Sequence, residues 1–103
     1  MMVKFSENVI KIIKAIPYGK VMTYGQIALL AGNPYGARQV SRLLHSLTTK
    51  ENLPWFRVVN KNGMISLQNE SGLVQKALLV DEGIEFINDK IDLNKYGVKR
   101  KDK

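Results

Sequence analysis

The sequence predicts a mainly α-helical domain with one small β-hairpin, the winged helix-turn-helix class. Apolar residues recur at helical spacing in three segments, an Asn-Pro-Tyr-Gly turn at 33–36 separates two predicted helices, and Asn62-Gly63 marks a tight hairpin turn. A chain of 103 residues forms one modest hydrophobic core, so we expect a single domain over residues 1–88. Residues 89–103 are Lys-rich and polar, and we expect them to form a basic C-terminal tail.

The first two helices are predicted from an apolar stripe and a pair of caps. The stripe comprises Phe5, Val9, Ile12, Ile13 and Ile16. Pro17 ends this helix. Thr23 and Gln26 then stand in capping-box relation, and Gly32 suits a C-terminal stop. We therefore expect a second helix over residues 24–31.

The third helix follows the turn and separates apolar from cationic residues. Its apolar stripe consists of Val40, Leu43, Leu44 and Leu47. The opposite side carries Arg38, Ser41, Arg42 and His45. This division suits docking to a DNA groove or backbone, although surface helices without any ligand show the same pattern.

A hairpin and a last helix complete the predicted fold. Residues 56–59 and 64–67 are expected to pair as the two strands of the wing. Ser71 is expected to cap the last helix and Gly83 to end it. The residues expected to face the core from this helix are Leu73, Val74, Ala77, Leu78 and Val80.

The charge distribution favours a polyanionic partner. The formal net charge is +7, and no acidic residue occurs between Glu7 and Glu51. The basic residues within that interval are Lys11, Lys14, Lys20, Arg38, Arg42 and Lys50. Because the interval also contains the predicted helix-turn-helix, we expect the positive field and the groove-binding element to coincide.

The residue types present exclude several kinds of site. The chain has no cysteine, which rules out a disulfide, a thiolate metal site and a cysteine nucleophile. His45 is the sole histidine and has no acidic cluster around it, so we expect no metal site, no Ser-His-Asp set and no cofactor. No segment approaches the roughly 18 apolar residues of a membrane span. We expect a monomeric cytoplasmic protein without a membrane partner, nucleoid-associated if bacterial.

One segment, Leu-Pro-Trp-Phe-Arg-Val-Val at 53–59, resembles the active-site segment of the O6-alkylguanine-DNA alkyltransferases, which carry Pro-Cys-His-Arg-Val there. Trp55 and Phe56 stand where the family has the alkyl-accepting cysteine and the histidine that activates it, and neither can do that chemistry. The spacings of Tyr24, Arg38 and Trp55 also agree with the family's. The further matching segments are 19–28, 37–40 and 78–84. The resemblance covers roughly residues 5–86 and implies a non-enzymatic, alkyltransferase-like protein.

The resemblance implies recognition of damaged DNA without repair. Such a protein enters the minor groove of double-stranded DNA containing O6-alkylguanine, flips the altered base and attracts nucleotide excision repair proteins. By resemblance, Arg38 fills the space left by the flipped nucleotide and Tyr24 presses against the adjacent phosphate. Gln39 and Arg42 are expected to bind DNA with them. The alternatives are an ordinary phosphate contact for Arg38 and a half-buried packing role for Tyr24.

A lesion pocket is implied by the same resemblance. Its expected residues are Trp55, Phe56, Arg57, Val58, Gln68 and Asn69. Trp55 would form the wall where the cysteine otherwise stands, or else be a core tryptophan, and Phe56 is expected to pack inward. Gln68 and Asn69 replace a tyrosine and a serine of the family and can still hydrogen-bond a purine edge. Glu82 matches the glutamate of the family's proton relay. Because Phe56 replaces the relay histidine, Glu82 is expected to lack that partner and to bond locally.

Two other functions remain open. A transcription regulator with this fold would need sequence readout and usually a dimer interface, and neither is visible in the sequence. An enzyme would need an alkyl acceptor, or a lysine or aspartate motif for base excision, and the sequence shows none of these. Binding that follows base sequence and ignores alkylation would favour the regulator.

Overall fold

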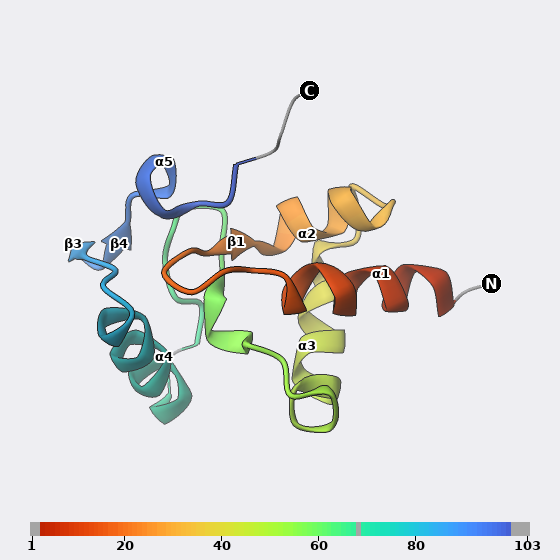
Figure 1. The fold of residues 1–103 in the computed structure, drawn as a ribbon, viewed down its shortest axis with the longest axis horizontal. Coiled ribbons are helices and arrows are strands. Elements are labelled where there is room, and N and C mark those ends of the chain that lie inside the picture. The colour runs from red at the N-terminus through yellow and green to blue at the C-terminus, as the bar shows by residue number, and fades with distance from the viewer. Residues whose placement is uncertain (1–2, 68, 100–103) are drawn as a thin grey trace.

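The computed structural model describes residues 3–67 and 69–99, and its elements form two groups on either side of a central strand pair (Figure 1). The elements are α1 (Val3–Lys14), β1 (Met22–Thr23), α2 (Tyr24–Ala31), α3 (Ala37–Glu51), the 3-10 turn η1 (Trp55–Arg57), β2 (Val58–Val59), α4 (Glu70–Asp81), β3 (Phe86–Ile87), β4 (Lys90–Ile91) and α5 (Leu93–Tyr96). Helices α1, α2 and α3 lie together, and α4, β3, β4 and α5 lie on the other side. The predicted mainly helical class with a helix-turn-helix is confirmed.

The core of the three-helix group is the one that the apolar stripes predict. Val9 and Ile13 of α1 and Val40 of α3 are fully buried, and they share one apolar cluster with Ile27 of α2. The α3 residues Arg38, Ser41, Arg42 and His45 are all exposed, as predicted. Burial of these aliphatic side chains fixes which face of α3 remains available to a ligand.

The helix-turn-helix is held by the predicted caps. The Thr23 hydroxyl accepts the Gln26 N–H at 3.0 Å at the start of α2, and Gly32 ends that helix with φ of 109°. The turn closes through the Gly36 N–H, which donates to the Asn33 carbonyl at 2.9 Å. A Cβ at Gly36 would lie 2.9 Å from the Phe5 ring, so glycine permits α1 to approach the turn closely.

Thr23→Ala is expected to lower the free energy of unfolding by about 1 kcal/mol, because the Gln26 N–H loses its acceptor. Denaturant unfolding measures the change. Thr49→Ala, an exposed threonine inside α3, is the matched control and should cost no stability. An equal loss in both variants would contradict a capping role.

The hairpin predicted over residues 56–67 is wrong. Strand β2 pairs with β1 in parallel, with Met22 opposite Val58 and Thr23 opposite Val59, and residues 64–67 form no strand. Both valines of β2 are buried, which is typical of parallel pairing between covered faces. The expected tight turn is present without the flanking strands. The Gly63 N–H donates to the Asn60 carbonyl at 3.0 Å, Gly63 has φ of 77°, and the Asn60 side chain accepts the N–H groups of Asn62 and Met64.

The antiparallel hairpin lies further along the chain, between β3 and β4. Phe86 pairs with Ile91 and Ile87 with Lys90, and the connecting Asn88 and Asp89 have φ of 54° and 65°. Two successive positive φ values identify the turn type whose twist suits a two-residue hairpin. Asparagine and aspartate tolerate this conformation without glycine, so the sequence carries only a weak signal for it.

The predicted tail from residue 89 is wrong for the residues that the structure describes. Ile91 is buried in a second apolar cluster, and Leu93 and Tyr96 of α5 pack against that cluster. The Val21 N–H donates to the Tyr96 carbonyl, and the Val98 N–H donates to the Val21 carbonyl, each at 2.9 Å. The segment 90–98 is therefore part of the fold, and residues 100–103 lie outside the described residues.

Helix α4 is rotated relative to the prediction. Its cap is Asn69, whose side chain accepts the Ser71 N–H at 3.0 Å, and not Ser71 itself. The side that packs inward carries Gly72, Gln75 and Leu79. The residues predicted to face the core, Leu73, Val74, Ala77, Leu78 and Val80, are all exposed.

The buried Gln75 explains this rotation. Its Nε2 donates to the carbonyls of Phe56 and Val58, both at 3.0 Å, so one amide satisfies two backbone acceptors next to η1. Burying a polar side chain is favourable only when it is hydrogen-bonded in this way. Gly72 brings the helix close to the backbone of Leu67, where a Cβ would collide with the carbonyl.

Among the described residues, none of the helices is long and apolar enough to cross a membrane.

Candidate nucleic-acid interface

The cationic side of α3 is exposed. Arg38 lies in the first turn of α3, Gln39 follows it, and Arg42 lies one turn further along, all three exposed. Within the part of the chain that the structure describes, no ion pair involves Arg38 or Arg42. Both guanidinium groups can therefore reach a phosphate or a base without breaking a contact inside the fold.

A cavity of about 330 Å³ opens beside this side of α3. Its walls come from α2, α3, η1 and the start of α4. Its lining consists of Tyr24, Ser41, Leu44, His45, Thr48, Thr49, Trp55, Leu67, Asn69, Ser71 and Gln75. Such a volume is within the usual range for small-ligand sites, and the mixed lining can contact both the flat face and the polar edge of a base.

Tyr24 and Trp55 both line this cavity. Tyr24 is the first residue of α2, and its hydroxyl lies 3.5 Å from the Ser66 hydroxyl. Trp55 is half-buried, lines the cavity and also packs against the apolar cluster of the three-helix group. The two interpretations of Trp55, as cavity wall and as core residue, therefore describe two sides of one indole.

Three other residues predicted for the pocket turn away from the cavity. Phe56 packs against the second apolar cluster, beside Val21 and Leu79. Val58 is buried in the first cluster, and Arg57 points to Glu82. In a 3-10 turn successive side chains point about 120° apart, so neighbours in sequence cannot share one wall.

The predicted polar edge of the pocket is divided. Asn69 lines the cavity, but its side-chain oxygen already caps α4 by accepting the Ser71 N–H. Its amide NH₂ remains as a donor for a ligand, and the oxygen is fixed in place by the cap. Gln68 lies outside the described residues.

Glu82 bonds to residues distant in sequence, and the prediction that it bonds locally is wrong. The Arg57 Nη2 donates to Glu82 Oε2 at 2.6 Å, and Nε donates to Oε1 at 3.0 Å. The Gly19 N–H adds a third donor at 2.8 Å, and Arg57 also donates to the Ile16 carbonyl at 2.9 Å. Burial alone would raise the pKa of Glu82, but the hydrogen bonds from Arg57 and Gly19 and the charge of Arg57 hold this pKa below its usual range. The pair joins η1 to the end of α4 and the loop after α1.

Several residues that line the cavity were not predicted from the sequence. His45, Thr48 and Thr49 follow one another on the cavity side of α3, where the sequence pattern indicated only an outer surface. Gln75 had a signal, because Gln75 and Lys76 interrupt the otherwise apolar segment 73–80 of α4. Such an interruption indicates either a buried hydrogen-bonding role or a ligand contact, and here it provides the first while bordering the cavity.

Comparison with known proteins places this site in a family. Residues 4–84 match the model described as "6-O-methylguanine DNA methyltransferase, DNA binding domain". The chain belongs to this family. It is 46% identical to a DNA base-flipping protein of Vibrio parahaemolyticus over 90% of the chain and 94% of the relative. It is 44% identical to a DNA base-flipping protein of Escherichia coli over 89% of the chain and 72% of the relative.

A solved relative supports the fold over nearly the whole chain. The alkyltransferase-like protein of Schizosaccharomyces pombe, in complex with damaged DNA containing O6-carboxymethylguanine, matches with a TM-score of 0.81 and 36% identity, covering 97% of this chain and 99% of that one. The O6-methylguanine methyltransferase of Mycobacterium tuberculosis matches with a TM-score of 0.62 and 28% identity, over 76% of this chain and 47% of that one.

This member of the family cannot perform alkyl transfer to a thiolate. Its sequence contains no cysteine, and Trp55 occupies the place of the acceptor in the motif. The protein is therefore not an alkyltransferase, in agreement with its similarity to base-flipping and alkyltransferase-like proteins.

Proposed function

We propose that this protein binds double-stranded DNA through α3, flips an O6-alkylated guanine into the cavity beside Trp55, and holds the base without dealkylating it. The observation that carries the proposal is the position of Trp55, an indole in place of a nucleophile on the wall of a cavity next to an exposed cationic helix face. The similarity to base-flipping proteins and to a complex with damaged DNA supports it.

The cavity lining suits an extrahelical purine. The flat indole of Trp55 offers van der Waals contact to a base, and His45, Thr48 and the Asn69 amide offer polar groups to its edge. Arg38, at the start of α3, can stack within the duplex and donate to the orphaned partner base, which offsets part of the cost of unstacking. Tyr24, which also lines the cavity, would press on the adjacent phosphate.

A protein that holds a lesion without repairing it depends on a second activity to remove the lesion. We infer that nucleotide excision repair proteins supply this activity, since they excise the damaged strand and need no acceptor group on the recognition protein. On this proposal the protein acts in the cytoplasm, and in a bacterium it associates with the nucleoid.

Competition binding with three matched duplexes tests the proposal. They contain guanine, O6-methylguanine or a bulkier O6-alkylguanine at one position in the same sequence. We expect both alkylated duplexes to compete more strongly than the undamaged one. Competition that depends on the flanking sequence and ignores alkylation would favour the transcription regulator instead.

Incubation with a duplex containing O6-methylguanine is expected to leave both partners covalently unchanged, because no thiolate can attack the alkyl carbon. Intact-mass measurement of protein and DNA checks this, with an active alkyltransferase of the family as the positive control. A stoichiometric gain of mass on the protein would overturn the proposal that it only holds the base.

A further inference from the structure

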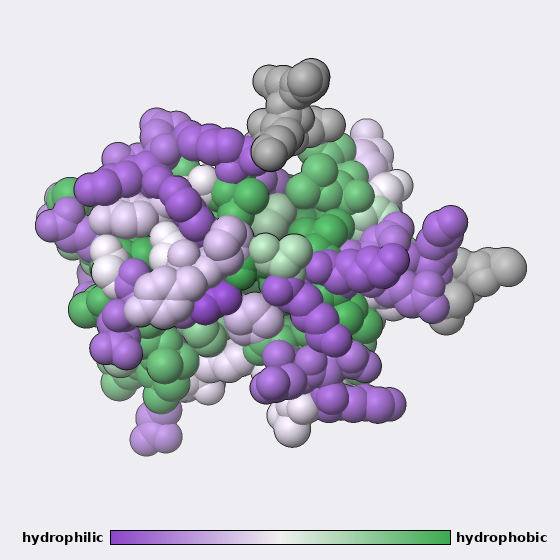
Figure 2. Space-filling view, in the orientation of Figure 1, coloured by the Kyte–Doolittle hydropathy of each residue, from purple (hydrophilic) through white to green (hydrophobic). Residues whose placement is uncertain are grey.

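The outer side of α4 is an apolar surface that the fold leaves uncovered. Leu73 is 71% exposed and Val74 is 50% exposed. We define the α4 surface as Leu73, Val74, Ala77, Leu78 and Val80. Figure 2 shows a green, hydrophobic area at the lower left, where Figure 1 places α4. Contiguous exposed apolar side chains of this kind mark binding surfaces in proteins that remain soluble.

Acidic residues flank the α4 surface. Glu70 and Asp81, at the two ends of α4, are both exposed. Eleven residues span about three helical turns, so these carboxylates point in nearly the same direction about 16 Å apart, with the apolar residues between them. The one lysine of the helix, Lys76, lies toward the other side and pairs with Asp89 at 3.3 Å.

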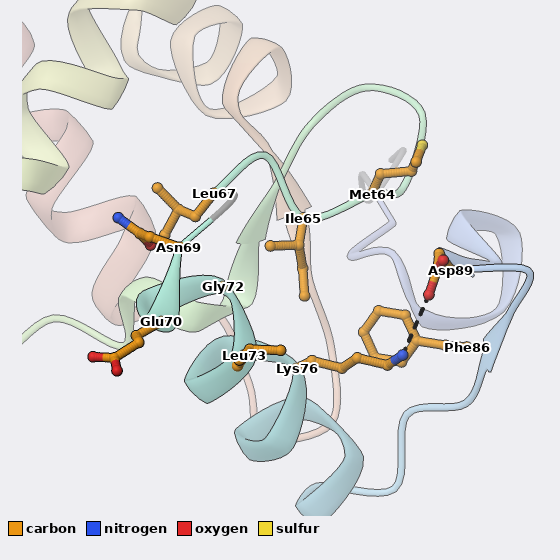
Figure 3. Close-up of a pocket in the computed structure, with 10 residues that line it drawn as sticks. All are labelled: Met64, Ile65, Leu67, Asn69, Glu70, Gly72, Leu73, Lys76, Phe86 and Asp89. Atoms are coloured by element: carbon orange, nitrogen blue, oxygen red, sulfur yellow. Dashed lines mark hydrogen bonds and ion pairs between the residues drawn. The ribbon is translucent and has the colours of Figure 1, made fainter.

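An apolar groove of about 610 Å³ continues the α4 surface on one side. Leu73 belongs to both, and Figure 3 shows Ile65, Leu73 and Phe86 turned toward a common space. The Lys76–Asp89 ion pair closes one end of the groove, with the ammonium 5.2 Å from the centre of the Phe86 ring. A bulky apolar side chain of a partner could be buried here, which is the usual anchor of a protein interface.

The charge of this region separates it from the DNA-binding side. Residues 70–92 contain six acidic residues and two lysines, whereas residues 8–50 contain six basic residues and no acidic one. An acidic border repels DNA phosphates and anionic lipid headgroups, and it attracts lysine and arginine. The occupant that fits is therefore a protein.

From these observations we propose that the α4 surface docks an amphipathic helix of a partner protein whose apolar ridge is flanked by lysine or arginine. Its apolar residues would cover Leu73 and Val74 with one inserted in the groove, and its cations would pair with Glu70 and Asp81. Leu67 and Asn69 border both this groove and the cavity beside Trp55, so the partner would sit next to the candidate lesion site. None of the α4 surface residues lines that cavity, so docking here does not depend on lesion binding.

Two probe peptides test the proposal by fluorescence anisotropy. One is an 18-residue amphipathic helix of leucine and lysine, and its twin carries glutamate in place of lysine. We expect saturable binding of the leucine–lysine peptide that weakens with salt, and little binding of its twin. Amide chemical-shift changes in the labelled protein should be confined to α4 and the groove. Absence of saturable binding, or shifts that map to α3, would overturn the proposal.

Surface variants make the test specific to α4. Leu73→Ser with Val74→Ser is expected to weaken peptide binding about tenfold or more, because two exposed contacts are lost. Leu29→Ser is the matched control, since Leu29 is 49% exposed on α2, and it should bind as the wild type does. Glu70→Lys with Asp81→Lys should reverse the preference between the peptides. Unchanged affinity in the leucine–valine variant, or a wild-type dimer that this variant dissociates, would contradict the proposed occupant.

Discussion

Glu82→Gln is expected to lower the free energy of unfolding by about 3–5 kcal/mol at neutral pH. The side chains of Arg57 and Glu82 are only 16% and 7% exposed, so the variant leaves a guanidinium charge in a largely dry position without its counter-charge. The glutamine keeps one acceptor oxygen, but it loses the second one and the negative charge. The bonds from Arg57 are then no longer bonds between opposite charges. Denaturant unfolding of both proteins measures the difference.

The effect of this pair should depend on pH in a defined direction. The pKa of Glu82 is lower in the folded protein than in the unfolded chain, where the pKa of a glutamate is about 4.3. The stability that the carboxylate contributes is therefore present above that value and is lost as the pH falls through the lower, folded pKa. Between neutral pH and strongly acidic pH, the wild type should lose more stability than Glu82→Gln.

Glu85→Gln provides the matched control, because Glu85 is exposed, three residues further along the chain. It should change stability little at neutral pH. If Glu85→Gln and Glu82→Gln had equal stability at neutral pH, or if Glu82→Gln kept the acid sensitivity of the wild type, the ion pair would not be what joins η1 to α4.

The elements that could be predicted from sequence are those specified by local signals. Thr23 and Gly32 bound α2 through contacts within one helical turn, and the stripe containing Val40 sets the inner face of α3. In contrast, α4 has apolar residues on most of its circumference, so periodicity does not determine its orientation. Its orientation depends on the non-local bonds from Gln75 to η1. The partner of β2 is likewise non-local, because β1 lies more than thirty residues earlier.

The part of the candidate site that could be predicted is the part in which the spacing of motif residues reflects their position in the fold. Tyr24 and Trp55 do border one cavity beside Arg38's helix, although they lie far apart in sequence. The neighbours Phe56 and Arg57 do not, because η1 sends them to the second apolar cluster and to Glu82. Phe56 instead supports the wall that Trp55 forms, because the two rings meet edge to face with their centroids 6.1 Å apart.

Arg38→Ala is expected to weaken binding to a duplex containing O6-methylguanine by about 1–3 kcal/mol, roughly 5- to 150-fold. The reason is that unstacking a base costs a few kcal/mol, which a guanidinium inserted in the duplex partly offsets. Arg38 is exposed in the first turn of α3, so its removal should leave the fold intact. Binding to undamaged DNA should fall much less, by the loss of about one counterion.

Two further variants distinguish insertion from simple charge. Arg38→Lys keeps the charge but loses the planar stacking group, so it should restore the salt dependence of binding without restoring lesion affinity. Lys50→Ala removes one exposed cation from the last turn of α3 and should weaken binding to damaged and undamaged duplexes alike, by a small factor. A fluorescent base analogue at the lesion position reports flipping directly. If Arg38→Ala behaved as Lys50→Ala does, with equal losses on both duplexes and undiminished flipping, Arg38 would be an ordinary phosphate contact.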